Sequence, residues 1–161
     1  MSQADRRERA MALFQEAYAH QMRKELDEAI RLYQESLALH PTAEAHTFLG
    51  WAYSFQGRLD EAIAECHKAI AVDPEFGNPY NDIGVYLIER GDLDGAVPWL
   101  ERAKQAPRYE PRHFPYMNLG RVYLRRGRWR EALRELEAAA RLAPADAGAR
   151  QMLHEIRARF N

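Results

Sequence analysis

The sequence predicts an all-α protein built from repeated pairs of helices. Three observations lead to this fold class. A 14-residue segment recurs along the chain at intervals close to 34 residues. Apolar residues between these segments follow helical spacing, and glycine or proline stands where each helix is expected to end. A repeat of this length is typical of a solenoid, in which neighbouring units stack on one another.

Four copies of the segment can be aligned by eye. The clearest three are LGWAYSFQGRLDEA (49–62), IGVYLIERGDLDGA (83–96) and LGRVYLRRGRWREA (119–132), and EAYAHQMRKELDEA (16–29) is a weaker first copy. The intervals between them are 33, 34 and 36 residues. The longer last interval reflects a two-residue insertion within the sequence PRYEPRH of the third unit.

Each unit is expected to contain two helices, as the second unit shows. The first helix ends at Gly57, because glycine adopts the left-handed conformation after a helix without steric cost. The second helix runs from about Leu59 to Val72 and stops at Asp73-Pro74, since the residue before proline avoids helical angles. One face of the first helix carries four residues at helical spacing: His46, Leu49, Gly50 and Tyr53.

Small residues are expected where the two helices of a unit cross. Gly50 stands opposite Ala62, and the pairs Gly84 with Ala96 and Gly120 with Ala132 repeat this arrangement. A larger side chain at such a crossing would push the helices apart.

These residues resemble the tetratricopeptide repeat, a helix–turn–helix unit of 34 residues. The second unit carries Leu49-Gly50, Tyr53, Gly57, Ala62, Ala69 and Pro74; the third carries Ile83-Gly84, Gly91, Ala96 and Ala103; the fourth carries Leu119-Gly120, Tyr123, Gly127, Ala132, Ala139 and Pro144. The first unit departs from the pattern at Ala17, His20 and Lys24. The resemblance implies a right-handed α-solenoid, in one domain over residues 1–161. Its expected parts are repeats at about 10–42, 43–76, 77–112 and 113–145 and a capping helix at about 146–160.

Composition excludes several other classes of protein. The chain of 161 residues has 47% hydrophobic and 29% charged residues, which is typical of a folded globular protein. No apolar run is long enough for a membrane span, and no secretory signal follows the charged start, so a cytoplasmic location without membrane contact is expected. Cys66 is the single cysteine, which excludes a disulfide framework or a cysteine zinc site within one chain.

The sequence contains none of the common catalytic motifs. It has no GxxxxGK[ST], GxGxxG, HExxH or GxSxG segment. Its six histidines form no pair at helical metal-ligand spacing, and Cys66 falls at an expected core position. We therefore expect no enzymatic activity, no catalytic residues, no cofactor and no metal.

The resemblance instead implies a protein-interaction scaffold whose first helices line a concave groove. The expected groove residues are Phe14, Tyr18, Met22, Trp51, Phe55, Asn81, Val85, Ile88, Met117, Arg121, Leu124 and Arg125. A peptide or helix of a partner protein is the expected ligand. Some family members hold a partner's C-terminal carboxylate with Lys, Arg and Asn, but Phe14, Tyr18 and Phe48 stand where such a clamp needs polar groups.

The helix AEAHTFLGWAYSF is apolar nearly all round, so Trp51 and Phe55 are expected to be covered. Three structures could cover these two side chains: neighbouring helices of the same chain, an apolar segment of a partner, or a second copy of the chain. The third would make the protein a self-associating scaffold.

Charge is distributed unevenly along the chain. Residues 1–106 carry a net charge of −7, and residues 107–161 carry +6. This dipole is a second route to a homo-oligomer, through head-to-tail contact. The basic turn RRGRWR (125–130) suggests nucleic-acid binding, but the pI near 6.6 lacks the strongly basic footprint of such proteins, and this function is disfavoured.

Overall fold

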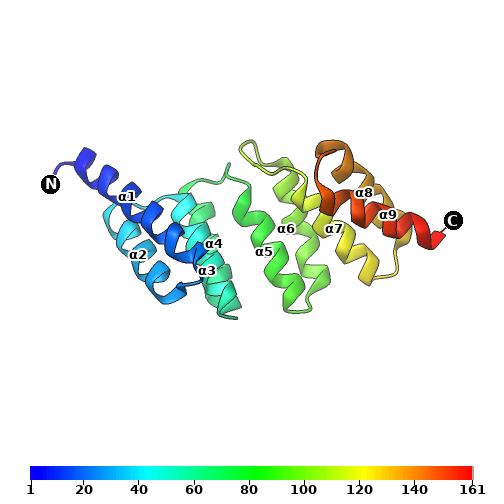
Figure 1. Cartoon of the computed structure of the whole chain (residues 1–161), viewed down its shortest axis with the longest axis horizontal. Coiled ribbons are helices and arrows are strands. Elements are labelled where there is room, and N and C mark those ends of the chain that lie inside the picture. The colour runs from blue at the N-terminus through cyan, green and yellow to red at the C-terminus, as the bar shows by residue number, and fades with distance from the viewer. Residues whose placement is uncertain (161) are drawn as a thin grey trace.

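The computed structural model describes residues 1–160, which form nine helices arranged as a curved stack (Figure 1). Their bounds are α1 Gln3–Met22, α2 Leu26–Leu39, α3 Ala43–Phe55, α4 Leu59–Val72, α5 Asn78–Glu89, α6 Leu93–Gln105, α7 Phe114–Arg125, α8 Trp129–Leu142 and α9 Ala147–Phe160. No β-strand is present in this part of the chain, apart from one isolated bridge between Phe76 and Arg108. The predicted all-α solenoid of helix pairs is confirmed.

Glycines of three helix pairs leave no room for a side chain at the contact between the two helices. A Cβ atom placed on Gly50 would lie 2.9 Å from the carbonyl oxygen of Ala62, on the facing helix α4. At Gly84 the equivalent atom would lie 2.5 Å from a methyl carbon of Leu100. Gly50 therefore meets Ala62 as the repeat pattern predicted, whereas Gly84 and Gly120 meet the side chains of Leu100 and Leu136 and not those of the expected alanines. A side chain at any of the three glycines would push the two helices of its pair apart.

The turn inside the first pair keeps the shape of the later turns although it lacks their glycine. Gly57, Gly91 and Gly127 all have positive φ angles, and Lys24 adopts the same left-handed conformation with φ of 61°. The short connection between α1 and α2 demands this conformation whichever residue occupies the position. Lysine accepts it at a conformational cost, because its Cβ crowds the backbone there.

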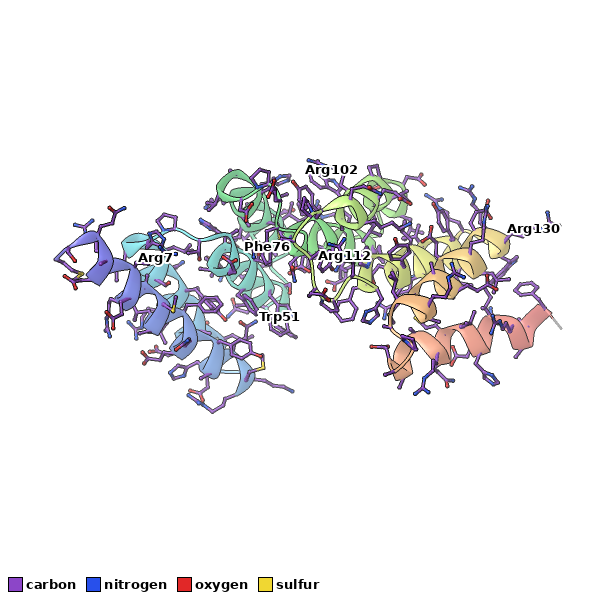
Figure 2. The ribbon with its side chains drawn as sticks, turned by 90° about the horizontal axis from the view of Figure 1, so that it is seen from above. Arg7, Trp51, Phe76, Arg102, Arg112 and Arg130 are labelled. Carbon is purple, nitrogen blue, oxygen red and sulfur yellow. The ribbon has the colours of Figure 1, made fainter. Side chains whose placement is uncertain are left out.

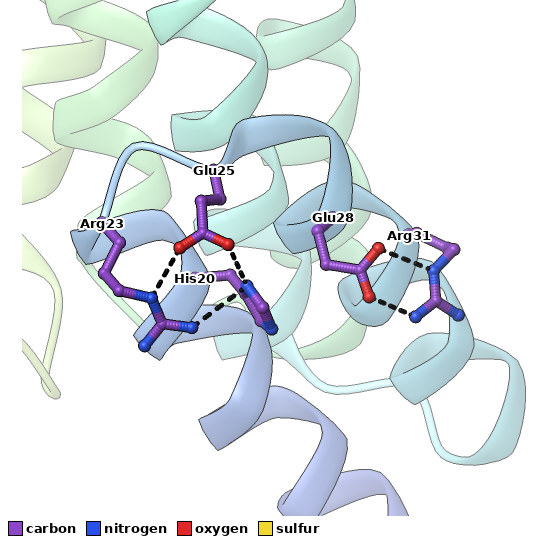
Figure 3. Close-up of polar contacts among 5 residues, drawn as sticks. All are labelled: His20, Arg23, Glu25, Glu28 and Arg31. Carbon is purple, nitrogen blue, oxygen red and sulfur yellow. Dashed lines mark hydrogen bonds and ion pairs between the residues drawn. The ribbon is translucent and has the colours of Figure 1, made fainter.

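Polar contacts beside Lys24 tie the two ends of this turn together (Figure 3). The Glu25 carboxylate accepts a hydrogen bond of 2.6 Å from the Arg23 guanidinium and lies 3.0 Å from Nδ1 of His20. On α2, Arg31 pairs with Glu28 one turn away. The arginine and glutamate side chains of these pairs are exposed, so each of their contacts contributes little to stability.

The two-residue insertion shapes the connection between α6 and α7. Here Arg108 lies alongside the segment before α5: its carbonyl accepts from the Gly77 amide at 2.9 Å, and its amide donates to Glu75 at 3.1 Å. The next residue, Tyr109, is buried, and its ring occupies the space that a side chain at Gly77 would need. The insertion is therefore a packed part of the fold.

The last helix, α9, packs on the final pair. Its Leu153 and Ile156 form one apolar cluster with Leu136 of α8. Helix α9 thereby covers Leu136, which α8 would otherwise expose at the end of the stack.

Candidate functional site

The inner side of the curved stack is formed by α1, α3, α5 and α7. Figure 2 shows Trp51 on this side, facing the space between the two ends of the chain, and Arg102 on the opposite side. All twelve residues expected in the groove lie on these four helices. The expected groove residues therefore belong to the helices that form one side of the stack.

Aromatic rings follow one another along the N-terminal half of this side. Phe48 of α3 lies 5.3 Å from Phe14 and 5.6 Å from Tyr18 between ring centroids, and both neighbours belong to α1. Along α3, Trp51 lies 5.9 Å from Phe48 and 5.2 Å from Phe55. We call these five residues the aromatic ladder. Apolar rings thus follow one another from α1 to the end of α3.

The ladder is only partly covered by its own chain. Phe14 and Trp51 are half-buried among neighbouring rings, but Phe55 is 59% exposed, Tyr18 is 42% exposed and Met22 is 48% exposed. Intramolecular packing therefore explains the covering of Trp51 but leaves Phe55 open to solvent. These three exposed side chains come from α1 and from the end of α3.

The middle of the groove differs from the sequence-based expectation at two residues. Asn81 is 4% exposed, and its side-chain oxygen accepts a hydrogen bond of 3.0 Å from Nδ2 of Asn118. Ile88 is 7% exposed and belongs to the apolar core with Leu100 and Leu119. Because α5 is flanked by α3 and α7, part of its inner face is covered by neighbours. Asn81 and Ile88 therefore join the repeats together and do not form free surface.

The C-terminal quarter of the groove is split between covered and exposed residues. Leu124 and Met117 are half-buried; Leu124 packs in the cluster that holds α9, and a Cβ on Gly148 of α9 would lie 3.5 Å from the Met117 methyl. Arg121 and Arg125 are exposed. In the middle of the groove, Val85 of α5 is half-buried against the core. The charged end of the expected groove is thus open, whereas its apolar part is largely covered by α9.

A hollow of about 330 Å³ opens between the inner helices beside the ladder. We call it the central hollow. Its lining comes from α3, α5, the α6–α7 connection and α7: Thr47, Phe48, Trp51, Asn78, Asn81, Asp82, Tyr109, Pro111 and Phe114. A second hollow, of about 370 Å³, lies at the N-terminal end between α1, α2 and the start of α3, and Met11 and Phe14 belong to its lining.

Sequence reasoning missed Asp82, Tyr109 and Pro111 of the central hollow. Tyr109 and Pro111 belong to the insertion, so the departure from the repeat length was the signal that could have found them. Asp82 is a charged residue directly before the buried Ile83, and a charge at this place in the sequence was the signal that could have found it.

Asp82 is the charged group of the central hollow. Desolvation raises the pKa of its carboxyl group to about 7, and the Asn81 side-chain amide opposes this only in part. None of the ion pairs formed by the described residues includes Asp82. An ionised carboxylate without a cation in an aromatic surrounding is unfavourable, which is the physical cause of the raised pKa.

The described part of the chain lacks a metal-binding cluster and a membrane-crossing helix, and its single cysteine is buried. Residues 1–160 contain no group of three or more His, Cys, Asp or Glu side chains placed to hold a metal ion. In the same part of the chain, none of the helices combines the length and the apolar character that crossing a membrane requires. Burial raises the pKa of the Cys66 thiol well above its ordinary value, so this group is a neutral core side chain.

The tetratricopeptide repeat family matches the chain at four places: residues 10–43, 43–76, 80–106 and 113–146. These matches cover most of the chain, and they coincide with the four helix pairs from α1 to α8. The chain belongs to the tetratricopeptide repeat family.

Solved structures of other tetratricopeptide repeat proteins share this fold. The chain is similar to PilF of Pseudomonas aeruginosa, with a TM-score of 0.86 and 24% identity over 94% of this chain and 69% of that one. A thermophilic TPR protein of Thermus thermophilus has a TM-score of 0.79 and 22% identity, over 91% of this chain and 80% of that one. MamA has a TM-score of 0.72 and 23% identity, over 92% of this chain and 81% of that one.

Among curated proteins, the TPR repeat-containing thioredoxin TTL4 of Arabidopsis thaliana is 28% identical over 81 residues. The match spans half of this chain but only 12% of that protein. The similarity is therefore one of repeats. At this level the tetratricopeptide repeat fold supports a role as a protein-interaction scaffold in general.

Proposed function

We propose that this tetratricopeptide repeat protein binds a peptide or helix of a partner protein on its inner surface. One observation carries the proposal: the inner helices expose Phe55, Tyr18 and Met22 beside the half-buried Trp51. Aromatic side chains dominate the energetics of protein interfaces, and they lose little conformational entropy on binding. A similar fold, YrrB, is described as a TPR protein with an unusual peptide-binding site, which supports a groove of this kind.

The proposed ligand surface runs along the aromatic ladder toward the exposed arginines of α7. An apolar segment of the partner would cover Phe55 and Tyr18, and acidic groups further along it would pair with Arg121 and Arg125. Asn81 and Ile88 are left out of this surface because they are buried between the repeats.

A defined peptide library tests the proposal. Peptides displayed on phage are selected on the wild-type chain, and their affinities are measured by calorimetry for the chain and for the double variants Trp51→Ala/Phe55→Ala and Tyr18→Ala/Phe55→Ala. Loss of anchors of this kind should weaken binding by more than about 2 kcal/mol, or roughly thirtyfold. The second variant removes only exposed rings, so its fold is preserved, which circular dichroism would verify.

The matched control removes exposed apolar side chains from the outer helices. Val72 of α4 and Leu142 of α8 are 46% and 49% exposed, fractions similar to those of Tyr18 and Met22. Val72→Ala/Leu142→Ala therefore deletes exposed apolar atoms outside the groove, although fewer of them than the ladder variants delete. Affinities of the selected peptides should not change in this variant. Equal affinities for the control and the ladder variants would overturn the groove proposal.

Self-association is the second candidate function, and the uneven charge of the chain favours it. The acidic residues 1–106 of one copy would contact the basic residues 107–161 of another. Light scattering across protein and salt concentration tests this: a larger species that dissociates in high salt supports head-to-tail contact. A species that persists in salt but is lost in Tyr18→Ala/Phe55→Ala would instead indicate apolar self-association through the ladder. A monomer at all concentrations would overturn this candidate.

A further inference from the structure

The central hollow contains hydrogen-bond acceptors that the chain itself satisfies only in part. The Asp82 carboxylate, on α5, has no cationic partner within residues 1–160. One turn earlier on the same helix, the side-chain oxygen of Asn78 is buried and accepts no hydrogen bond. The nitrogen of that amide donates to the Glu110 carbonyl at 3.3 Å, which holds the oxygen in place. Two acceptors, one of them charged, therefore share one hollow.

The neighbouring repeat shows how the same position is normally satisfied. Asn118 is the equivalent of Asp82, because Gly120 aligns with Gly84, and it donates to Asn81 of the preceding repeat at 3.0 Å. The corresponding neighbour of Asp82 is Thr47, whose hydroxyl is already committed to the Ala43 carbonyl at 2.7 Å. Asp82 therefore makes no such bond across its repeat boundary, and the Asn81 side-chain amide on its own helix satisfies its carboxylate only in part.

The walls around these acceptors are aromatic. Phe48 and Trp51 contribute from α3, Tyr109 from the α6–α7 connection and Phe114 from α7, and Phe114 is 41% exposed. Aromatic faces attract a cation, and a carboxylate between them adds a full negative charge. The lining contains no cationic side chain. Charge complementarity therefore specifies a cationic occupant.

Among cations found in proteins, a guanidinium fits this lining best. It has five N–H donors, enough for both Asp82 and Asn78, and its flat, weakly hydrated face stacks on aromatic rings. A quaternary ammonium group has no donor and would leave the Asn78 oxygen unsatisfied. The ammonium group of lysine donates as well, but it is more strongly hydrated and has no flat face to stack.

We propose that the central hollow binds an arginine side chain of the partner protein, whose guanidinium donates to the Asp82 carboxylate and to the Asn78 side-chain oxygen. This proposal rests on the proposed function, since the arginine arrives on the segment that occupies the groove. It adds a selectivity rule: the segment carries an arginine at the point that passes between α3 and α5.

A tripeptide titration tests the hollow separately from the rest of the groove. Acetyl-Gly-Arg-Gly-amide is titrated into the ¹⁵N-labelled full chain, alongside the same peptide with lysine or with citrulline, the neutral isostere of arginine. The arginine peptide should shift the Trp51 indole, the Asn78 side-chain amide and the Asp82 backbone amide, with a dissociation constant on the order of 1 mM. The lysine peptide should bind several-fold more weakly, and the citrulline peptide should not bind measurably.

Two variants and pH complete the test. Asp82→Asn copies the residue found one repeat later and should weaken arginine binding at least about tenfold. Glu89→Gln, which removes an exposed carboxylate from the same helix, should leave it unchanged. Affinity should fall about tenfold from pH 8 to pH 6, because Asp82 with a pKa of about 7 gains a proton over this range.

Three other titratable groups lie near Asp82, and all of them stay neutral over this range. They are Cys66 on α4, Tyr86 on α5 and Tyr109 in the α6–α7 connection. Burial first, and then the charge of Asp82, raises the pKa of each. A change in affinity between pH 6 and 8 therefore reports on Asp82 and not on these groups.

Several outcomes would overturn the arginine assignment. They are equal binding of the arginine and citrulline peptides, equal binding of the lysine peptide, or unchanged binding in Asp82→Asn. Failure of the tripeptide, together with library peptides that lose affinity in the ladder variants, would remove the arginine proposal and leave the proposed function intact. Library peptides whose affinity does not change in the ladder variants would overturn the proposed function, whatever the result with the tripeptide.

Discussion

Replacing Asp82 with asparagine should stabilise this protein, although it removes a charged residue that lines the groove. In the native chain the carboxyl group has a pKa of about 7, whereas the ordinary value is 3.8. A raised native pKa means that folding favours the protonated acid. Its stabilising contribution is full below pH 3.8 and is lost as the pH rises to about 7. Asparagine keeps the shape of the protonated acid and cannot ionise.

The size of the effect follows from the difference between the two pKa values. About three pKa units correspond to roughly 4 kcal/mol, which is an upper limit for the cost of ionised Asp82 above pH 7. The residue keeps partial access to solvent along the hollow, and water screens part of this cost. We therefore expect Asp82→Asn to raise the free energy of unfolding at pH 8 by about 2 to 3 kcal/mol.

Urea unfolding, followed by circular dichroism from pH 4.5 to pH 8, measures this difference. The gain of Asp82→Asn over the wild type should grow as the pH rises through this range and become constant above about pH 7.5. Equal m values for both proteins ensure that the same transition is compared. Glu89→Gln is the control, since it removes an exposed carboxylate of α5 and should change the free energy of unfolding at pH 8 much less than Asp82→Asn does.

A gain that is the same at pH 5 and pH 8 would refute this reasoning, because it would not come from ionisation of Asp82. A variant less stable than the wild type at pH 8 would refute it as well. Either result would show that the carboxylate is well solvated or paired in solution. The unpaired acceptor on which the arginine proposal rests would then be absent.

Two further predictions concern the backbone and the core. Lys24→Gly should raise the free energy of unfolding by about 1 kcal/mol, because glycine adopts the positive φ of this turn without steric cost, whereas Gly57→Ala should lower it by a similar amount. Urea unfolding measures both changes. A loss of stability in Lys24→Gly would contradict the account of this turn. Gly84→Ala should cost about 1 to 3 kcal/mol in the same assay, because the new methyl group would meet Leu100 at 2.5 Å. A neutral effect would mean that α5 and α6 can separate freely.

Much of the fold could be predicted because the repeat unit encodes its own local geometry. Gly57, Gly91 and Gly127 end the first helix of their units, and the prolines near the unit ends stop the second. The same spacing places Gly50 against Ala62, but Gly84 and Gly120 face Leu100 and Leu136, one helical turn beyond the corresponding alanines. Residues close together in the sequence make these contacts, and helical periodicity is enough to find them.

The candidate site could be predicted only in part, because it depends on contacts between units. Helical spacing placed Phe55 and Tyr18 on the inner helices, and both are exposed there. It could not show that Ile88 and Asn81 are covered, because this depends on how closely α5 approaches α7 and α3. It could not find Tyr109 either, since no periodic pattern describes the path of an insertion.

The sequence by itself determined the helix pairs, their turns and their stacking order, because these follow from short-range spacing repeated four times. Only the tertiary structure decided that Lys24 adopts a left-handed conformation without glycine, since the connection between two packed helices imposes it. Only the tertiary structure, too, brought Asp82 together with Trp51 and Tyr109 in one hollow. These residues come from three separate segments, and their distance depends on how neighbouring repeats pack against one another, which no single repeat contains.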